Sequence, residues 1–171
     1  MKYPQNLIPI ALCNVIYKII SKVIANRLWP LLPFLISPEQ AEFVVGRQIL
    51  DGIILVHETI HSVKIGKILG MLLKLDLSKA YDKLNWKFLA GVLQAFGFSA
   101  QWTGWVMKLV SSSFCSILVN GTPSSPFQVS RRIKQGDPMS PFLFILEVEG
   151  LGRMLKNLHI DNNIKGISLN V

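Results

Sequence analysis

Residues 71–77 alternate between apolar and polar positions, and this pattern predicts a β-strand. One face of the strand is entirely apolar: Met71, Leu73, Leu75 and Leu77. The other face carries Asp76, and apolar positions then recur at helical spacing from Tyr81 to about Phe96. A carboxylate between a strand and a helix is well placed to hold a divalent cation against a phosphate, although solvated Asp residues are also common there.

Helical periodicity and capping residues predict four further helices. Asn14 predicts the cap of a helix that runs to about residue 28, and residues 49–63 form a second helix with Asp51 near its start. A third helix spans residues 99–112, and its predicted buried side consists of Trp102, Trp105, Val106 and Leu109. Ser140 followed by Pro141 predicts the cap and first turn of a helix that ends near residue 157.

Between these helices we expect short strands and loops. Residues 114–119 and 127–130 read as strands, and Asn120-Gly121 suits a hairpin turn between them. The prolines after residue 28 predict a ten-residue loop, residues 43–47 a short extended segment, and residues 164–171 the start of another strand. This order predicts an α+β fold, with a small antiparallel sheet and helices packed on one face.

Composition narrows the class of protein. The chain has 171 residues, 50% of them hydrophobic and 16% charged, with a net charge of +8. One domain with a polyanionic partner is expected, as is an apolar surface that packs against something else. Polar residues and glycines interrupt the uncharged run 88–107, which excludes a membrane span. Cys13 and Cys115 are expected as buried thiols in a reducing compartment, so we expect an intracellular protein of the nucleus or cytoplasm, not a secreted one.

A second cluster, residues 131–141, reads Arg-Arg-Ile-Lys-Gln-Gly-Asp-Pro-Met-Ser-Pro. Together with residues 74–82 it resembles the palm of reverse transcriptases, specifically those of plant LINE-type (non-LTR) retrotransposons. Residues 13–22 and 40–49 are similar to finger motifs of the same family. The resemblance implies a single partial domain, with residues 1–70 fingers-like and residues 71–171 palm-like.

The resemblance implies an RNA-directed DNA polymerase that uses two magnesium ions, an RNA template, a DNA primer and deoxynucleoside triphosphates. It makes Asp76 the first catalytic carboxylate and the Leu77 carbonyl a further metal ligand. Tyr81 matches the ring that excludes a 2′-hydroxyl, with a core tyrosine as the alternative. The other implied nucleotide-binding residues are Gln135, Gly136 and Arg47. Basic side chains, which a solvated surface would also explain, would contact nucleic acid: Lys18, Lys22, Arg131, Arg132 and Lys134.

The sequence departs from the family pattern at several positions. Ile8 and Val45 replace a usual Arg and Pro, and Arg132 replaces a usual Gly, which disfavours a special backbone angle. Glu147 places a charge on an apolar helix face, where it costs stability if buried without a partner.

No Asp-Asp pair occurs in the chain, so the family's Ala-Asp-Asp hairpin is missing, as is the thumb. We therefore expect no polymerisation by the chain as given. The alternative to a polymerase domain is a non-catalytic nucleic-acid-binding remnant or a decayed gene product. A membrane-associated structural protein would rest on hydrophobicity alone.

Overall fold

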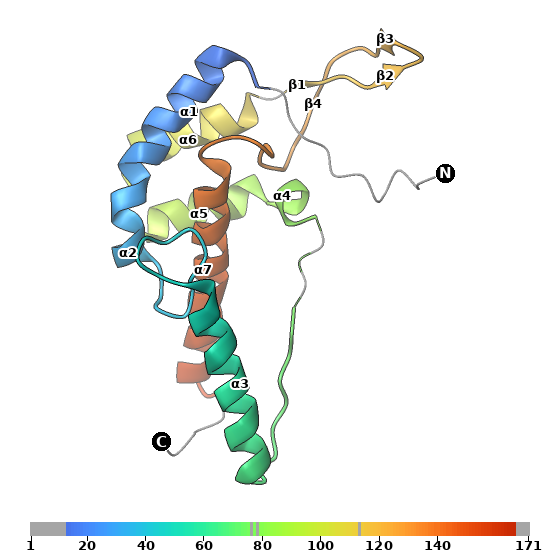
Figure 1. Ribbon diagram of the computed structural model, residues 1–171. Coiled ribbons are helices and arrows are strands. Elements are labelled where there is room, and N and C mark those ends of the chain that lie inside the picture. The colour runs from blue at the N-terminus through green and yellow to red at the C-terminus, as the bar shows by residue number, and fades with distance from the viewer. Residues whose placement is uncertain (1–12, 76, 78, 113, 167–171) are drawn as a thin grey trace.

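The computed structural model describes residues 13–75, 77, 79–112 and 114–166 (Figure 1). The helices are α1 (Val15–Leu28), η2 (Trp29–Leu31), α2 (Leu32–Leu35), α3 (Ile49–Ile65), α4 (Ala80–Lys83), α5 (Trp86–Ala95), α6 (Ala100–Ser111) and α7 (Ser140–Ile160). The strands are β1 (Phe114–Cys115), β2 (Leu118–Val119), β3 (Thr122–Pro123) and β4 (Phe127–Gln128). This mixture of helices and short antiparallel strands confirms the α+β class.

The core forms where α5 packs against α6 and α7, and where α1 packs against α6. Leucines dominate its fully buried positions: Leu28, Leu32, Leu84, Leu89, Leu93, Leu143 and Leu146. Burying a side chain of this size contributes about 1.5–3 kcal/mol relative to leaving it exposed. Helices α1, α5, α6 and α7 therefore share an apolar core, and Figure 1 shows these helices grouped together.

Caps explain where the predicted helices begin. Asn14 Oδ1 accepts a hydrogen bond from the Tyr17 amide at 2.7 Å, and Ser99 Oγ accepts one from the Trp102 amide at 3.2 Å. Both helices start as predicted because these bonds satisfy amides that have no partner inside the helix. At α7 the prediction was one residue off, since Met139 is the cap and Ser140 the first helical residue. The helix also ends at Ile160, beyond the predicted residue 157.

The predicted single helix from Tyr81 to Phe96 is wrong, because α4 and α5 are separate. Asn85 interrupts it, with its side-chain Oδ1 accepting from the Lys87 amide at 2.9 Å and the Phe88 amide at 3.3 Å. Such a side chain offers the backbone an alternative to the helical ladder and starts a new helix.

The prediction of a ten-residue loop after α1 is wrong, because this segment forms η2 and α2. Pro30 and Pro33 lie in the first turns of η2 and α2, where an amide hydrogen is not needed, and Pro38 lies in a turn after α2. Residues 43–47 are turns and not an extended segment, and Phe43 has a φ of 58°. The predicted buried side of α6 is confirmed at Val106 and Leu109, but Trp105 is 46% exposed.

The strands form two separate ribbons, β1 with β4 and β2 with β3. The predicted turn at Asn120-Gly121 is confirmed, with φ values of 50° and 82°, but the strand that follows it is β3, which was not predicted. The ribbons pair Cys115 with Phe127 and Val119 with Thr122. The segment read as one strand over residues 114–119 is thus divided between β1 and β2. Cys115, like Cys13, is half-buried and not fully buried as predicted.

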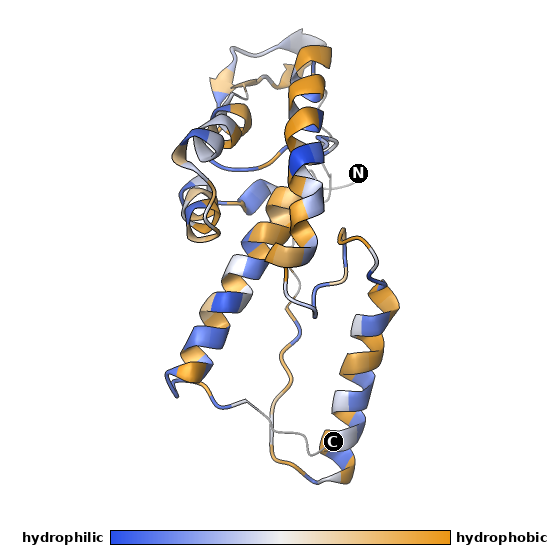
Figure 2. Ribbon diagram, turned by 90° about the vertical axis from the view of Figure 1, so that its left-hand side faces the viewer, coloured by the Kyte–Doolittle hydropathy of each residue, from blue (hydrophilic) through white to orange (hydrophobic). Residues whose placement is uncertain are grey.

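Residues 71–75 and 77 form no strand, so the strand prediction there is wrong for the described part of the segment. Asp76 lies outside the described residues. The segment returns from α3, which begins as predicted and has no buried residue, and which stands away from α7 (Figure 2). Residues 164–166 have no regular structure, and the rest of the predicted last strand lies outside the described residues. No helix in the described part of the chain is long and apolar enough to cross a membrane.

Gly150 fixes how closely α7 approaches α5. A Cβ atom added at Gly150 would lie 2.6 Å from Cγ2 of Val92, a stiff and buried side chain of α5. Two residues further along the same helix, a Cβ added at Gly152 would have no neighbour within 4 Å. The two glycines therefore differ in packing while sharing a helix.

We expect Gly150→Ala to lower the free energy of unfolding by about 1–3 kcal/mol through overpacking. Gly152→Ala is the matched control and should raise it by about 0.5–1 kcal/mol, since only helix propensity changes. Urea unfolding followed by circular dichroism measures both. Equal effects of the two substitutions would contradict the close approach.

Candidate nucleic-acid interface

The loop of residues 131–140, which carries the second motif, is bound to α4 by backbone hydrogen bonds. The Arg132 amide donates to the Leu84 carbonyl at 3.1 Å, and the Ile133 amide donates to the Tyr81 carbonyl at 2.8 Å. The indole Nε1 of Trp86 donates to the Arg132 carbonyl at 2.8 Å. The two sequence motifs therefore meet, although neither shows this contact by itself.

The same loop contacts α1. The Met139 amide donates to Oγ of the buried Ser21 at 3.3 Å, and Nζ of Lys134 lies 3.5 Å from the centre of the Tyr17 ring. Burial raises the pKa of Tyr17, and Asp137 and Cys13 add to the shift. The ammonium group of the half-buried Lys134 therefore makes a cation–π contact with the neutral ring of Tyr17.

Tyr81 packs on α7. Its ring centre lies 5.3 Å from that of Phe144, with an angle of 56° between the planes. The side chain is half-buried, and burial, followed by the negative charge of Glu42, raises its pKa. A neutral ring packed on Phe144 is compatible both with the predicted exclusion of a 2′-hydroxyl and with a core tyrosine, so the role of Tyr81 stays a prediction.

The middle of the loop requires glycine. Gly136 has a φ of 88°, a conformation that favours glycine, while Gln135 beside it is half-buried. Asp137 is buried, and Ser140 Oγ donates to its Oδ2 at 3.2 Å. Burial raises the pKa of Asp137, because its hydrogen bonds offset the lost hydration only in part. The loop thus turns sharply between a polar side chain and a buried carboxyl group.

The two arginines of the loop have different surroundings. Arg131 is exposed, whereas Arg132 is half-buried and has a φ of 111°. Arg132 Nη1 lies 3.7 Å from Sγ of Cys115, and its buried Nε has no hydrogen-bond partner among the described residues. A residue other than glycine is strained at this angle. This confirms the prediction that Arg in place of the family's usual Gly disfavours the backbone conformation at position 132.

Lys18 and Lys22 are exposed on α1, on the turns that also carry Tyr17 and Ser21. Because Tyr17 and Ser21 contact the loop, these lysines lie on the helix that flanks it. The candidate interface therefore has exposed cations both on α1 and, at Arg131, in the loop that α1 contacts.

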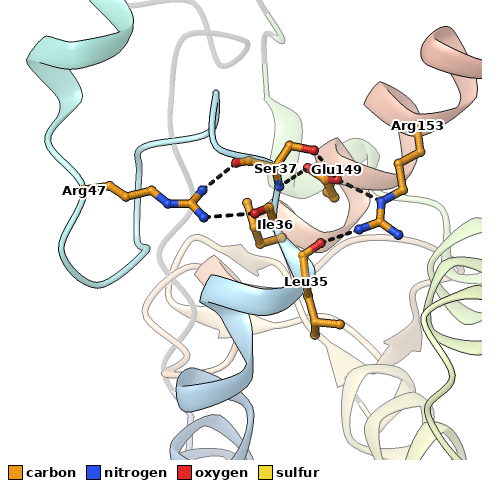
Figure 3. A network of polar contacts seen from close by, with 6 residues as sticks. All are labelled: Leu35, Ile36, Ser37, Arg47, Glu149 and Arg153. Atoms are coloured by element: carbon orange, nitrogen blue, oxygen red, sulfur yellow. Dashed lines mark hydrogen bonds and ion pairs between the residues drawn. The ribbon is translucent and has the colours of Figure 1, made fainter.

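Arg47 lies in a different network (Figure 3). Its Nη1 donates to the carbonyls of Ser37 and Gln40, the latter at 2.8 Å, and its Nη2 donates to the Ile36 carbonyl at 3.0 Å. The guanidinium group thus holds the chain after α2 in its turns. Contact with a nucleotide triphosphate stays a prediction for Arg47, and the structure adds this role in holding the fold.

The network continues to α7 through Glu149, which sequence reasoning missed (Figure 3). Its carboxylate accepts from the Ser37 amide at 3.0 Å, from Ser37 Oγ at 2.7 Å and from Arg153 Nε at 2.9 Å. Burial alone would raise the pKa of Glu149, but these donors outweigh it and hold the pKa below its usual value. The spacing of Glu149 and Arg153 on one helix was the available signal.

The described residues do not fit a two-magnesium site. Such ions need several close oxygen ligands, and the described part of the chain has no group of three or more His, Cys, Asp or Glu side chains placed to hold a metal. Leu77 is exposed and lines a pocket of about 330 Å³ between α4, α5 and α7. The acid in that pocket is Glu147, whose pKa burial raises.

Comparison with known proteins identifies the class. Residues 2–167 match the family model described as reverse transcriptase (RNA-dependent DNA polymerase). Since this match covers nearly the whole chain, the protein belongs to the reverse transcriptase family. More narrowly, it is a reverse transcriptase domain of non-LTR retrotransposon origin.

Two of the relatives that cover most of the chain are at least 30% identical to it. It is 32% identical over 145 residues to the transposon TX1 uncharacterized 149 kDa protein of Xenopus laevis, a match of 85% of this chain and 11% of that protein. It is 30% identical over 155 residues to the Pol polyprotein from the type-2 retrotransposable element R2DM of Drosophila melanogaster, covering 90% and 14%. An uncharacterized mitochondrial protein of Arabidopsis thaliana is 38% identical over 50 residues, covering 29% and 41%. The chain thus spans a small part of the first two relatives.

We predict that Arg132→Gly stabilises the protein by about 1 kcal/mol, because glycine removes the strain of a positive φ. Arg132→Ala removes the same side chain but keeps the strained backbone, so it should be less stable than Arg132→Gly. Denaturant midpoints of the two variants give the comparison. Arg132→Ala at least as stable as Arg132→Gly would show that the angle carries no strain.

Glu149→Gln should lower the free energy of unfolding at pH 7 by about 1–3 kcal/mol, since it removes charge-assisted hydrogen bonds. The lowered pKa means that this stabilisation is complete above the usual 4.5 and is lost as the pH falls below it. Glu147→Gln is the matched control on the same helix. Its raised pKa means that the ionised form costs stability, so Gln should raise the free energy of unfolding at pH 7 and have no effect below 4.5.

Unfolding in urea at pH 7 and at pH 3 measures both variants. The same sign of effect for the two substitutions at pH 7 would contradict the assigned environments.

Proposed function

We propose that this chain binds an RNA template paired with a DNA primer, as the nucleic-acid-holding part of a reverse transcriptase. The carrying observation is the attachment of residues 131–140 to both α4 and α1. That attachment supports a basic surface in which Lys18, Lys22 and Arg131 remain exposed for phosphates. Each such contact releases a counterion and adds affinity without reading sequence.

The polymerase roles remain part of this proposal. Asp76 would be the first metal-binding carboxylate, with the carbonyl of Leu77, and further ligands would have to come from outside the described residues. Tyr81 would select the deoxyribose, and Gln135 and Gly136 would lie beside the incoming nucleotide. Arg132 and Lys134 would act on the nucleic acid less directly, because both are half-buried.

A plant retrotransposon is the proposed origin, and the Arabidopsis thaliana relative supports it. We also propose fingers-like and palm-like parts, residues 1–70 and 71–171, and the packing of α1 on α6 would belong to the contact between them. A non-catalytic nucleic-acid-binding remnant is the second candidate.

We predict that the 171-residue chain binds an RNA–DNA hybrid with an affinity that falls steeply with salt. Replacing Lys18, Lys22 and Arg131 by Ala should reduce the slope of log affinity against log salt by about 2 to 3. Ala at the equally exposed Lys64, Lys87 and Lys156 is the charge-matched control and should leave most of the slope. Fluorescence anisotropy at several salt concentrations measures the slopes. Equal slopes for the two triple variants would refute the assigned surface.

The same hybrid, supplied with magnesium and deoxynucleotides, separates the two candidate functions. We expect binding without primer extension, because Asp76 alone cannot hold two ions. Template-dependent extension that disappears in Asp76→Ala would instead establish a working polymerase.

A further inference from the structure

An apolar groove runs between α1 and α6, away from the loop of residues 131–140. It has a volume of about 490 Å³, and its apolar wall is formed by Ile19, Ile20, Val23 and Ile24 from α1 and by Trp105 and Leu109 from α6. Ile19 is 58% exposed, and Trp105, which was predicted to be buried, is 46% exposed. Figure 2 views the side of the molecule on which α1 lies and shows hydrophobic colour along much of this helix.

The fold does not account for this apolar wall. α1 already has a buried face, made by Ser21, Ile24, Ala25 and Leu28, that packs into the core. Ile19, Ile20 and Val23 lie on the outer side of the helix and contribute little to that core. A surface helix normally carries polar residues there, so a second apolar face indicates contact with another molecule.

The charges at the groove have one sign. Arg27 and Lys108 line it, each in the last turn of its helix, and both side chains are exposed. Neither α1 nor α6 contains an Asp or Glu residue. A partner must therefore offer apolar side chains for the wall and negative charge at its border.

We propose that this groove binds an amphipathic helix of a protein partner, whose apolar face is bordered by acidic residues. Side chains at i, i+3, i+4 and i+7 would enter the groove against Trp105, a residue type enriched at binding hot spots. Glutamates beside that stripe would meet Arg27 and Lys108. The concave apolar wall favours a helix over nucleic acid, whose outer surface is phosphate, and over a membrane, which a protruding surface suits better.

The test uses a designed 18-residue helical peptide with a leucine stripe bordered by Glu, and a twin with Lys in place of every Glu. In anisotropy titrations at low salt, the Glu peptide should bind at least tenfold more tightly than the Lys twin. Ile20→Glu should weaken binding of the Glu peptide at least tenfold. Ile65→Glu, an equally radical change at an exposed position of α3, should not alter it.

Charge reversal makes the test independent of any loss of folding. Arg27→Glu with Lys108→Glu should reverse the preference, so that the Lys twin binds more tightly, which a misfolded variant would not reproduce. Lys64→Glu with Lys156→Glu changes the net charge by the same amount away from the groove and should keep the original preference.

Three results would overturn the proposal. They are equal binding of the two peptides, retention of the Glu preference after reversal at Arg27 and Lys108, and failure of the Glu peptide to bind while single-stranded RNA or anionic vesicles bind at these residues. Lys18, Lys22 and Arg131 do not line the groove, so the triple Ala variant of those residues should retain the preference for the Glu peptide over the Lys twin. Failure of the proposed hybrid binding is thereby distinguishable from failure of this inference.

Discussion

The backbone of residues 131–140 is the constraint on which the rest of the arrangement depends. A buried loop must find partners for its amides and carbonyls, and this one finds them on α4, α1 and the Trp86 side chain. Ile133 and Met139 are buried at the same time. Detaching the loop would therefore expose apolar side chains and leave polar groups on α1 and α4 without their partners in the loop. The loop thereby couples α1 to α4.

Local signals explain which elements could be predicted. A capping oxygen lies within three residues of the amide that it satisfies, so Asn14 and Ser99 mark helix starts without any knowledge of the fold. The turn at Asn120-Gly121 is equally local. Periodicity is less informative at Trp105, because spacing shows that an apolar face exists but not which of two apolar faces turns inward.

In the candidate site, too, local features could be predicted from the sequence, whereas contacts between distant residues could not. The departure at Arg132 was readable because a backbone angle that requires glycine acts at one residue, and its φ of 111° confirms it. The network of Ser37 with Glu149 joins residues 112 positions apart, and a single sequence gives no sign of such pairing. Arg47 is a second example, because the sequence does not show that its guanidinium group donates to the backbone carbonyls of residues 36, 37 and 40.

The exposed apolar residues of α3, of residues 71–75 and of α1 differ in their relation to the fold. A helix satisfies its own backbone, so α3 forms with no buried residue, whereas a strand needs neighbours and residues 71–75 have none in the described chain. The outer face of α1 is different, because α1 is already packed on its inner face. Its exposed residues Ile19, Ile20 and Val23 do not belong to the buried core, and that is why they support the proposed binding.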